Sequence, residues 1–532
     1  MNLHQINKET LLNSVKSKIG YPVNCNVVMA TIESMGVREK DIFIDFGNNN
    51  LLDLATEIFD KLRVSVISTD VNLNRNKKSE KTIPVSGYLR VKAKLFVKYY
   101  PLGLLHFLPV LVQLITIVLF GYSLWTYVGF NQLQSTAVVL GVIIGMVITG
   151  GFVQVIGRQV SFYWNYKNYS MMNLTIIYLL KVGIITILLL FTALFLINFF
   201  IHLYPYSFLI IVFIYALLIG VLLLLLAPMH TIKQRWVVSV VICIGTILAL
   251  FLKEYTTINV YITHWIGIST SIILSKLYLF YYFKKKVNKN YVLNKSMRVL
   301  KIIRHNSAYF FYGLLLYLFI FTDRILAWSS SLDRVSPYII YYEKNYEIGM
   351  DIAILIFLLL AGVLEYSVAS FSKFLNIGQK NTAYNSPKEF GKHLLKLYWQ
   401  HVGLLLISSV LVFGLVYYIV TGTWGYEAQF KESLDNLSIR VCIIGSLGYL
   451  FLAWAMLNTL YMFTLNQPKK PIKALVIALL VNLFIGIIMS RVVAYELSVV
   501  GMFFGAITFL AITLKDCVVF YKNLDYYYYA TY

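Results

Sequence analysis

The chain has 532 residues, of which 59% are hydrophobic and only 13% are charged, and 46 Lys and Arg residues against 24 Asp and Glu residues give a formal net charge of +22. Soluble domains are usually about half apolar and about a quarter charged. The composition therefore excludes an ordinary soluble enzyme and a disordered chain, and it predicts a polytopic membrane protein. The four cysteines, Cys25, Cys243, Cys442 and Cys517, lie far apart and show neither a disulfide framework nor a metal-ligand spacing.

Residues 1–90 contain no apolar run long enough to cross a bilayer. They also lack the charged start, apolar stretch and small-residue cleavage site of a signal peptide. Apolar residues recur at helical spacing over residues 7–19, 27–35 and 51–62. We therefore expect a small helical domain in the cytoplasm, followed by a polar linker over residues 72–98. This domain is a candidate docking module for a cytoplasmic glycosyltransferase partner.

Twelve apolar segments follow from Leu104 onward, each long enough to span about 30 Å of hydrocarbon. They cover residues 104–128, 135–157, 181–202, 207–228, 236–252, 257–283, 308–328, 348–372, 400–420, 441–465, 472–490 and 497–520. The longest basic loop, residues 284–306, separates six segments from six, a division found in transporters built from two halves. The predicted fold is all-α, with about twelve transmembrane helices in two six-helix halves and a small helical N-terminal domain in the cytoplasm.

These segments also predict the domain boundaries. The expected domains are a helical domain with its linker over residues 1–90, a first six-helix bundle over 104–283, a basic cytoplasmic connector over 284–306, a second six-helix bundle over 307–520 and a Tyr-rich cytoplasmic tail over 521–532.

The distribution of Lys and Arg between the loops predicts the orientation in the membrane. With both termini on one side, the loops on that side hold 23 Lys and Arg residues, and the opposite loops hold six. Basic loops face the cytoplasm and its anionic leaflet, which places both termini inside a cytoplasmic (inner) membrane. Interaction of these loops with the anionic lipids of the bilayer accounts for the strong positive charge. No nucleic-acid partner is therefore expected.

Ionisable side chains within the apolar segments are the first candidates for function, because a charge in hydrocarbon costs several kcal/mol unless it is paired or hydrated. The seventh segment carries Asp323 and Arg324, and the eighth carries Asp351 and Glu365. Fourteen residues separate the last two, which places them on one helix face. Glu365 has no charged residue within one turn and is the leading candidate for a proton-binding or cavity-facing acid. Arg158 is a candidate rim cation for an anionic substrate.

Neutral polar residues within the segments form a second group of candidates. His264 lies in the sixth segment without an acidic neighbour, and Asn458 and Asn482 lie on neighbouring segments. Hydrogen bonds between helices, worth about 1 kcal/mol each, are their favoured role. No nucleophile elbow, phosphate loop or zinc-protease pair occurs in the sequence. No catalytic residue, metal site or cofactor is therefore expected, and the chain is not predicted to be an enzyme.

Three stretches of the second half carry a family resemblance. Residues 346–373 resemble the eighth helix of polysaccharide flippases in the multidrug/oligosaccharidyl-lipid/polysaccharide (MOP) superfamily, and residues 473–486, with Asn482, are similar to the eleventh helix. The stretch 309–313 followed by 322–328 resembles the seventh helix of Pel-type exopolysaccharide exporters. The resemblance implies two six-helix bundles around a central cavity lined by spans 1, 2, 7 and 8, with alternating access. Residues 1–90 depart from this pattern.

We therefore expect an exporter or flippase that moves a polysaccharide or lipid-linked saccharide out across the membrane. A cation-coupled multidrug exporter is the alternative within transport. From other classes, an integral-membrane glycan polymerase or acyltransferase, or a scaffold for a glycan synthase, stays open. The first two of these would need acids or histidines on the outer loops, and those loops offer acids but no histidine.

Overall fold

The computed structural model describes residues 3–20, 22, 24–74, 85–287, 299–330, 338–381, 387–422 and 434–523. Within these residues the chain is helical, and the β-type pairing consists of one isolated bridge between Tyr122 and Tyr127. The predicted tail beyond residue 523 and residues 288–298 of the predicted connector lie outside the described residues.

The N-terminal helices pack around a small apolar core of their own. They are α1 (Leu3–Ile19), α2 (Cys25–Ser34), the short α3 (Glu39–Asp41), the single wide turn η1 (Ile42–Phe46) and α4 (Leu51–Asn74). Asn24 caps α2 by accepting a hydrogen bond from the backbone N–H of Val27, and Asn50 does the same for Asp53 in α4. The core contains Val15, Val28, Ile32, Ile42, Leu54 and Ile58. Helical periodicity located α1, α2 and α4 correctly.

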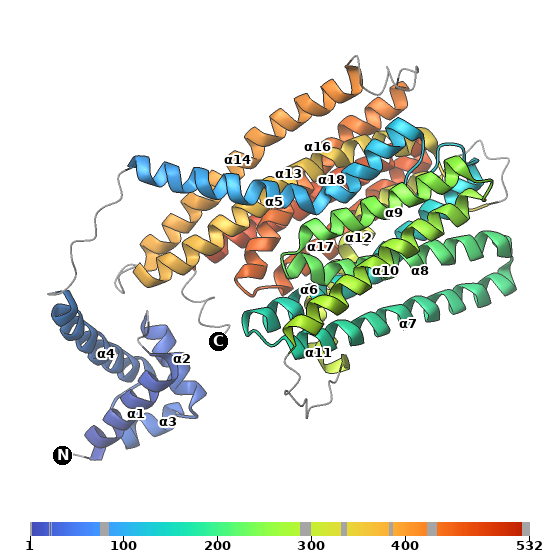
Figure 1. The fold of residues 1–532 in the computed structure, drawn as a ribbon. Helices are drawn as coiled ribbons and strands as arrows, with labels where there is room; N and C mark the ends of the chain where they lie inside the picture. Colours follow the sequence, from blue (N-terminus) through green and yellow to red (C-terminus); the bar gives the residue numbers. More distant parts are fainter. Residues whose placement is uncertain are drawn as a thin grey trace. The chain divides into compact units, whose positions relative to one another are not determined.

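The membrane helices run in two sets of six. The first half holds α5 (Val85–Phe120), α6 (Gln132–Asn165), α7 (Tyr169–Ile201), α8 (Tyr206–Thr231), α9 (Arg235–Tyr255) and α10 (Val260–Lys286). After the short α11 (Val299–His305), the second half holds α12 (Ser307–Trp328), α13 (Lys344–Asn381), α14 (Pro387–Thr421), α16 (Asn436–Thr464), α17 (Lys469–Ile488) with the turns η2 (Met489–Val493) and η3 (Tyr495–Leu497), and α18 (Ser498–Lys522). Figure 1 shows both sets.

The number of spans agrees with the sequence. Eleven of the described helices are long and apolar enough to cross a membrane. Helix α5 adds a twelfth when its two pieces, Lys92–Leu105 and Leu108–Ile117, which meet at 53°, are counted as one bent span. Pro109 lacks the N–H that would bond to the carbonyl of Leu105, which accounts for a bend at this point. The chain is therefore a multi-pass membrane protein.

Helices begin and end within the predicted linker over residues 72–98. Helix α4 continues to Asn74, and α5 begins at Val85, well before the predicted start of the first span. Residues 75–84 lie outside the described residues. Lys94 and Lys98 are exposed on α5, because the polarity of this stretch limits burial but does not prevent helix formation.

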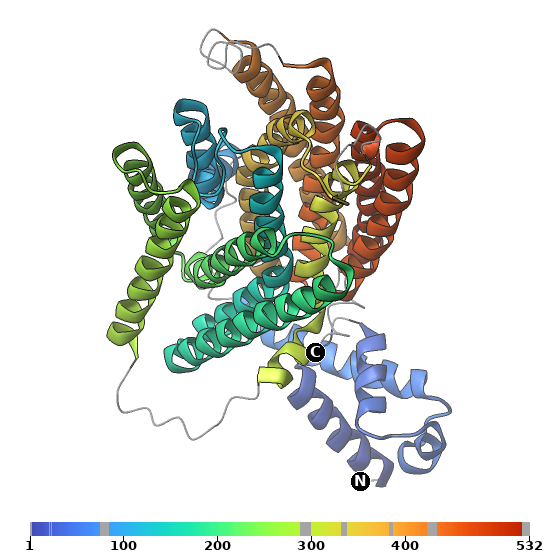
Figure 2. The same cartoon turned by 90° about the vertical axis from the view of Figure 1, so that its right-hand side faces the viewer.

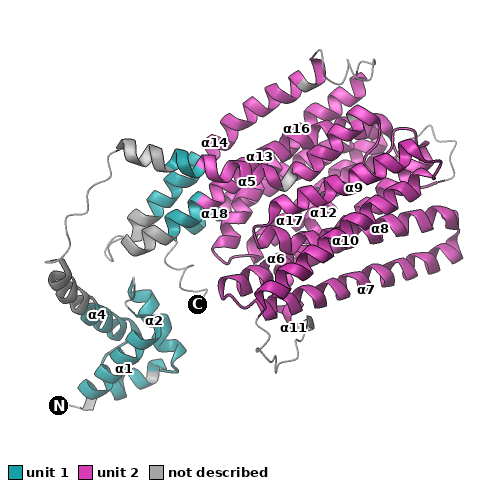
Figure 3. Ribbon diagram, viewed as in Figure 1, with its two compact units in different colours: residues 1–95, 370–400, 516–532 teal, residues 96–369, 401–515 magenta. Residues whose placement is uncertain are grey.

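Two compact units divide the chain (Figure 3). One contains residues 1–95, 370–400 and 516–532, and the other contains residues 96–369 and 401–515. Within the smaller unit, the rings of Phe371 and Tyr398 pack against Tyr521, and Lys92 Nζ donates to Gln400 Oε1 at 2.7 Å. The domain boundaries expected from the sequence stay predictions.

Helices α6 and α12 join the two halves within the larger unit (Figure 2). A Cβ atom on Gly313 would lie 2.3 Å from the carbonyl oxygen of Gly150, so the two backbones approach as only glycine permits. We call the end of the spans that carries the basic loops, with Arg158 in α6 and Arg235 in α9, the basic end. The other end is the opposite end.

Candidate functional site

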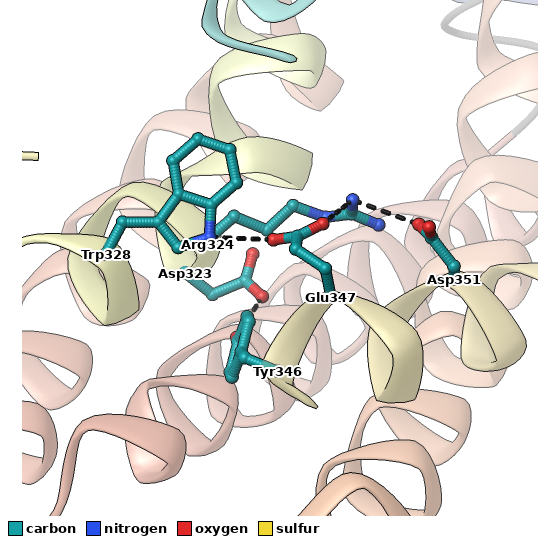
Figure 4. Close-up of polar contacts among 6 residues, drawn as sticks. All are labelled: Asp323, Arg324, Trp328, Tyr346, Glu347 and Asp351. Carbon is teal, nitrogen blue, oxygen red and sulfur yellow. Dashed lines mark hydrogen bonds and ion pairs between the residues drawn. The ribbon is translucent and has the colours of Figure 1, made fainter. Parts of the chain in front are cut away.

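A polar cluster lies at the opposite end of the second half, where α12 ends and α13 begins. The last turns of α12 supply Asp323, Arg324 and Trp328, and the first turns of α13 supply Tyr346, Glu347 and Asp351 (Figure 4). Residues four apart share one side of a helix. Arg324 and Trp328 therefore face α13 together, and Glu347 and Asp351 face α12 together.

Arg324 lies between two carboxylates of α13. Its Nη1 contacts Glu347 Oε2 at 2.5 Å and Asp351 Oδ1 at 3.2 Å. The indole Nε1 of Trp328 donates to Glu347 Oε1 at 2.9 Å, so both oxygens of Glu347 accept hydrogen bonds. The side chains of Arg324 and Glu347 are 6% and 3% exposed, and that of Asp351 is 53% exposed. Asp351 is therefore the accessible edge of a buried group.

Asp323 has a separate partner. The hydroxyl of Tyr346 donates to Asp323 Oδ2 at 2.6 Å, and Asp323 Oδ1 has no hydrogen-bond partner within the described residues. Neighbouring residues on a helix point about 100° apart, so Asp323 and Arg324 face different partners. The residue is fully buried. One oxygen of this buried carboxyl group thus has a donor and the other has none within the described residues.

The cluster brings three carboxyl groups, Asp323, Glu347 and Asp351, close to one guanidinium. If all were ionised, the four charged groups would sum to −2, and the charge on the buried Asp323 would have no cation in contact, which is costly. A proton or a bound cation would neutralise part of this charge. Arg324 occupies the space between two of the carboxylates, and no group of three His, Cys, Asp or Glu within the described residues could hold a metal ion. The arrangement therefore suits proton binding.

Glu365, the leading candidate from the sequence, lies apart from this cluster. It is fourteen residues beyond Asp351 on α13, a distance of about 21 Å along the helix. Its Oε1 pairs with Nη2 of Arg235 in the first half at 2.8 Å. The structure thus separates the two acids that share a face of α13, and each has an arginine partner.

Arg158 is exposed near the basic end of α6. Its Nη2 donates to Asn466 Oδ1 at 3.2 Å, and its guanidinium lies 5.2 Å from the ring centre of Tyr309. It also lines an open hollow of about 340 Å³ whose other walls are polar and aromatic: Ser161, Phe162, Asn165 and Tyr166. A cation, a hydroxyl, an amide and two rings are groups able to contact an anionic or saccharide ligand.

The secondary candidates make hydrogen bonds between helices. His264 Nδ1 bonds with the hydroxyl of Tyr215 at 2.6 Å. Asn458 Nδ2 donates to Thr513 Oγ1 at 3.2 Å, and Asn482 Nδ2 donates to the carbonyl of Phe319 at 3.1 Å. All three side chains are buried. These contacts are those of helix packing.

Sequence reasoning missed four residues of these sites: Glu347, Tyr346 and Trp328 in the cluster, and Arg235 beside Glu365. Glu347 falls at the edge of its apolar segment, where an acid resembles a loop residue. Its spacing of four from Asp351 was the signal that could have identified it. Arg235 falls in the basic loop between the predicted segments 207–228 and 236–252, and nothing in the local sequence indicates its partner.

No protein-family model matches the chain, and no curated protein matches it in sequence. Solved structures do match. A eukaryotic MATE transporter gives a TM-score of 0.57 at 14% identity, covering 82% of this chain and all of its own, 100%. A MOP superfamily transporter from Pyrococcus furiosus gives 0.55 at 11% identity, covering 81% and 97%.

A third similar structure is a multidrug resistance MATE family transporter of the MOP superfamily in an outward-facing conformation. It gives a TM-score of 0.54 at 10% identity and covers 81% of this chain and 96% of its own. Identities this low establish the fold alone. The all-helical, two-half arrangement is therefore the MATE-like fold found in transporters of the MOP superfamily.

Proposed function

We propose that the protein is a secondary exporter that works by alternating access and exchanges a proton at the cluster of Asp323, Arg324, Glu347 and Asp351. The observation that carries this proposal is one guanidinium shared by two carboxylates, Glu347 and Asp351, next to a further buried carboxyl group, Asp323, which bonds to Tyr346. Such an excess of carboxyl groups in an apolar setting marks ion and proton pathways. The MATE-like fold supports the transport class, and similar solved structures are transporters.

The proposed route for a proton begins at Asp351. Its exposed carboxylate shares Arg324 with the buried Glu347, so a proton that arrives at Asp351 weakens one of the two ion pairs of the guanidinium. Arg324 then interacts more strongly with Glu347. A change of charge at an accessible residue is in this way transmitted to the contact between α12 and α13.

The proposed substrate is a polysaccharide or lipid-linked saccharide, as in Pel-type exporters. The hollow beside Arg158 supports this choice, because it combines one cation with hydroxyl, amide and aromatic groups. The resemblances of residues 309–328 and 346–373 support it as well. The proposed location is the inner membrane with both termini in the cytoplasm, and residues 1–90 are proposed to dock a glycosyltransferase.

Cation-coupled multidrug export is the second candidate. The observation in its favour is the likeness to an outward-facing structure of a multidrug resistance MATE family transporter. Such an exporter would protect cells from small hydrophobic cations and would do so without any glycan synthase.

A deletion strain tests both candidates. Loss of surface glycan with saccharide accumulating inside the cell is the expected result. Loss without accumulation would favour a polymerase or synthase scaffold, and unchanged glycan with new sensitivity to hydrophobic cations would favour drug export.

Variants in the deletion strain then test the coupling site. Glu347→Gln and Asp323→Asn should fail to restore export, although both proteins reach the membrane in normal amounts. The matched control is Glu254→Gln, which changes an exposed carboxylate of α9 and should restore export fully. Normal export by Glu347→Gln and Asp323→Asn would remove the cluster from the coupling mechanism.

A further inference from the structure

Arg235 connects three helices of the two halves at the basic end. It is the first residue of α9, and its Nη1 donates to the carbonyl of Leu102 in α5 at 3.0 Å. Its Nη2 bonds to Glu365 of α13 in the second half at 2.8 Å. The side chains of Arg235 and Glu365 are 15% and 29% exposed, so water and salt screen the pair less than an exposed one.

Close packing of α5 against α13 surrounds this contact. A Cβ atom on Gly103 would lie 2.6 Å from Cα of Gly362 and 2.9 Å from Cβ of Glu365. The backbones of the two helices therefore touch next to Glu365. The carboxylate is thus held beside the carbonyl of Leu102, and one guanidinium reaches both.

A second arginine of the first half makes a similar bridge. Arg158 in α6 donates to Asn466, which lies between α16 and α17, and stacks on Tyr309 of α12. Both arginines lie at the basic end, and the side chain of each contacts a side chain of the second half. The first half thus supplies the cations, and the second half supplies an acid, an amide and an aromatic ring.

Contacts between the halves at the opposite end are of another kind. Gln132 Nε2 donates to the carbonyl of Tyr342 at 2.6 Å, and the N–H of Tyr342 donates to Thr136 Oγ1 at 3.0 Å. The hydroxyl of Tyr204 bonds with the backbone of Ile340. These groups are neutral. Among the contacts named here, those between the halves are charged at the basic end and neutral at the opposite end.

From this asymmetry we infer that Arg235 is a gating residue, and that its ion pair with Glu365 forms a latch holding the basic ends of the two halves together. Arg158 strengthens the latch through Asn466 and Tyr309. The inference rests on the proposed alternating access, in which contacts at one end must separate before that end opens. It assigns Glu365 the role of an ion-pair partner for the first half, in place of the proton-binding role expected from the sequence.

Distances between spin labels in the full-length protein, reconstituted in lipid nanodiscs, test the latch. One label pair, at Tyr166→Cys and Lys469→Cys, reports on the basic end. A second pair, at Tyr255→Cys and Val492→Cys, reports on the opposite end, and the four native cysteines are replaced by alanine. Arg235→Gln and Glu365→Gln should each shift the basic-end distribution to longer distances and shorten the opposite-end distances, and adding Arg158→Gln should enlarge both shifts.

The charge exchange Arg235→Glu with Glu365→Arg should return the basic-end distribution toward that of the wild type, which a proton-binding role for Glu365 would not produce. Lys253→Gln breaks a partly exposed ion pair at the other end of α9 and is the matched control; it should change neither distribution. Wild-type distributions in both single variants would overturn the latch. If those variants had no effect but the wild-type distances still responded to pH, the latch alone would fail. Distances that never change under any condition would contradict alternating access as well.

Discussion

The two halves bury polar side chains of different kinds. In the first half the buried polar side chains are neutral, with Gln113 bonded to Thr246 and Tyr215 bonded to His264 among them. In the second half they include Asp323, Arg324 and Glu347. Among the described residues, every buried Asp, Glu and Arg belongs to the second half, although both halves contain six spans.

Buried neutral groups and buried ionisable groups place different demands on the fold. A neutral amide or hydroxyl needs one partner, and a hydrogen bond between helices then contributes about 1 kcal/mol to packing. One guanidinium cannot balance the charges of Asp323, Glu347 and Asp351 together, so in the proposed coupling the second half takes up and releases a proton. The proposed change of charge is thus confined to the second half.

The largest effect is expected from Arg324→Gln. It leaves the buried carboxylate of Glu347 without its cation, and breaking a buried ion pair costs about 3–5 kcal/mol. We expect a large fall in the thermal unfolding temperature of the purified protein, and in its yield. Adding Glu347→Gln should recover much of the loss, because the unpaired charge is then removed. Equal stability of Arg324→Gln and wild type would show that the two halves do not differ in this way.

The sequence alone identified part of the polar cluster between α12 and α13. Asp323, Arg324 and Asp351 stand out because ionisable residues are rare in apolar segments. It missed Glu347, because an acid at the edge of a segment is ordinary and only the spacing from Asp351 marks it, and it could not pair Glu365 with Arg235. That pair joins residues 130 positions apart and depends on how the halves pack. Spans follow from local hydropathy, whereas partners follow from tertiary contacts.

A smaller effect is expected where α6 of the first half packs against α12 of the second half. Gly313→Ala places a Cβ 2.3 Å from the carbonyl oxygen of Gly150, and the backbones must separate. Overpacking of this kind costs about 1–3 kcal/mol. The matched control is Gly414→Ala in α14, where a Cβ meets no atom within 4 Å and helix propensity improves. Thermal unfolding should therefore move in opposite directions, and a fall of similar size in both variants would contradict the close approach.

Tyr215→Phe should have a modest effect, confined to stability. The change removes the partner of His264 Nδ1 in the first half, and the loss of one such hydrogen bond costs about 1 kcal/mol. Export per molecule in the membrane should stay at the wild-type level, since this polar pair serves helix packing. Export that falls well below the amount of folded protein would give the first half a functional polar site and weaken the contrast with the second.

The smallest effect is expected in the N-terminal helices, where the partly exposed carboxylate of Glu57 pairs with Lys8 and Lys61. Burial alone would raise the pKa of Glu57, but hydrogen bonds from Lys61, Lys8 and Asn48 lower it from 4.5 to about 2. Because the folded pKa lies below the unfolded one, the stabilisation is present above pH 4.5 and is lost as the pH falls toward about 2. Partly exposed ion pairs contribute about 0.2–1 kcal/mol.

Hydrogen exchange of α1 and α4 amides in the full-length protein, corrected for intrinsic rates, measures this contribution. Glu57→Gln should reduce protection at pH 7, and the difference from wild type should disappear near pH 2. Glu9→Gln, at an exposed site on α1, serves as the control and should change protection little at either pH. A Glu57→Gln difference that persisted at pH 2 would mean that packing, not charge, is what Glu57 supplies. Loss of the difference would show that this partly exposed carboxylate, with Lys8 and Lys61 beside it, stabilises the fold through its ionised form.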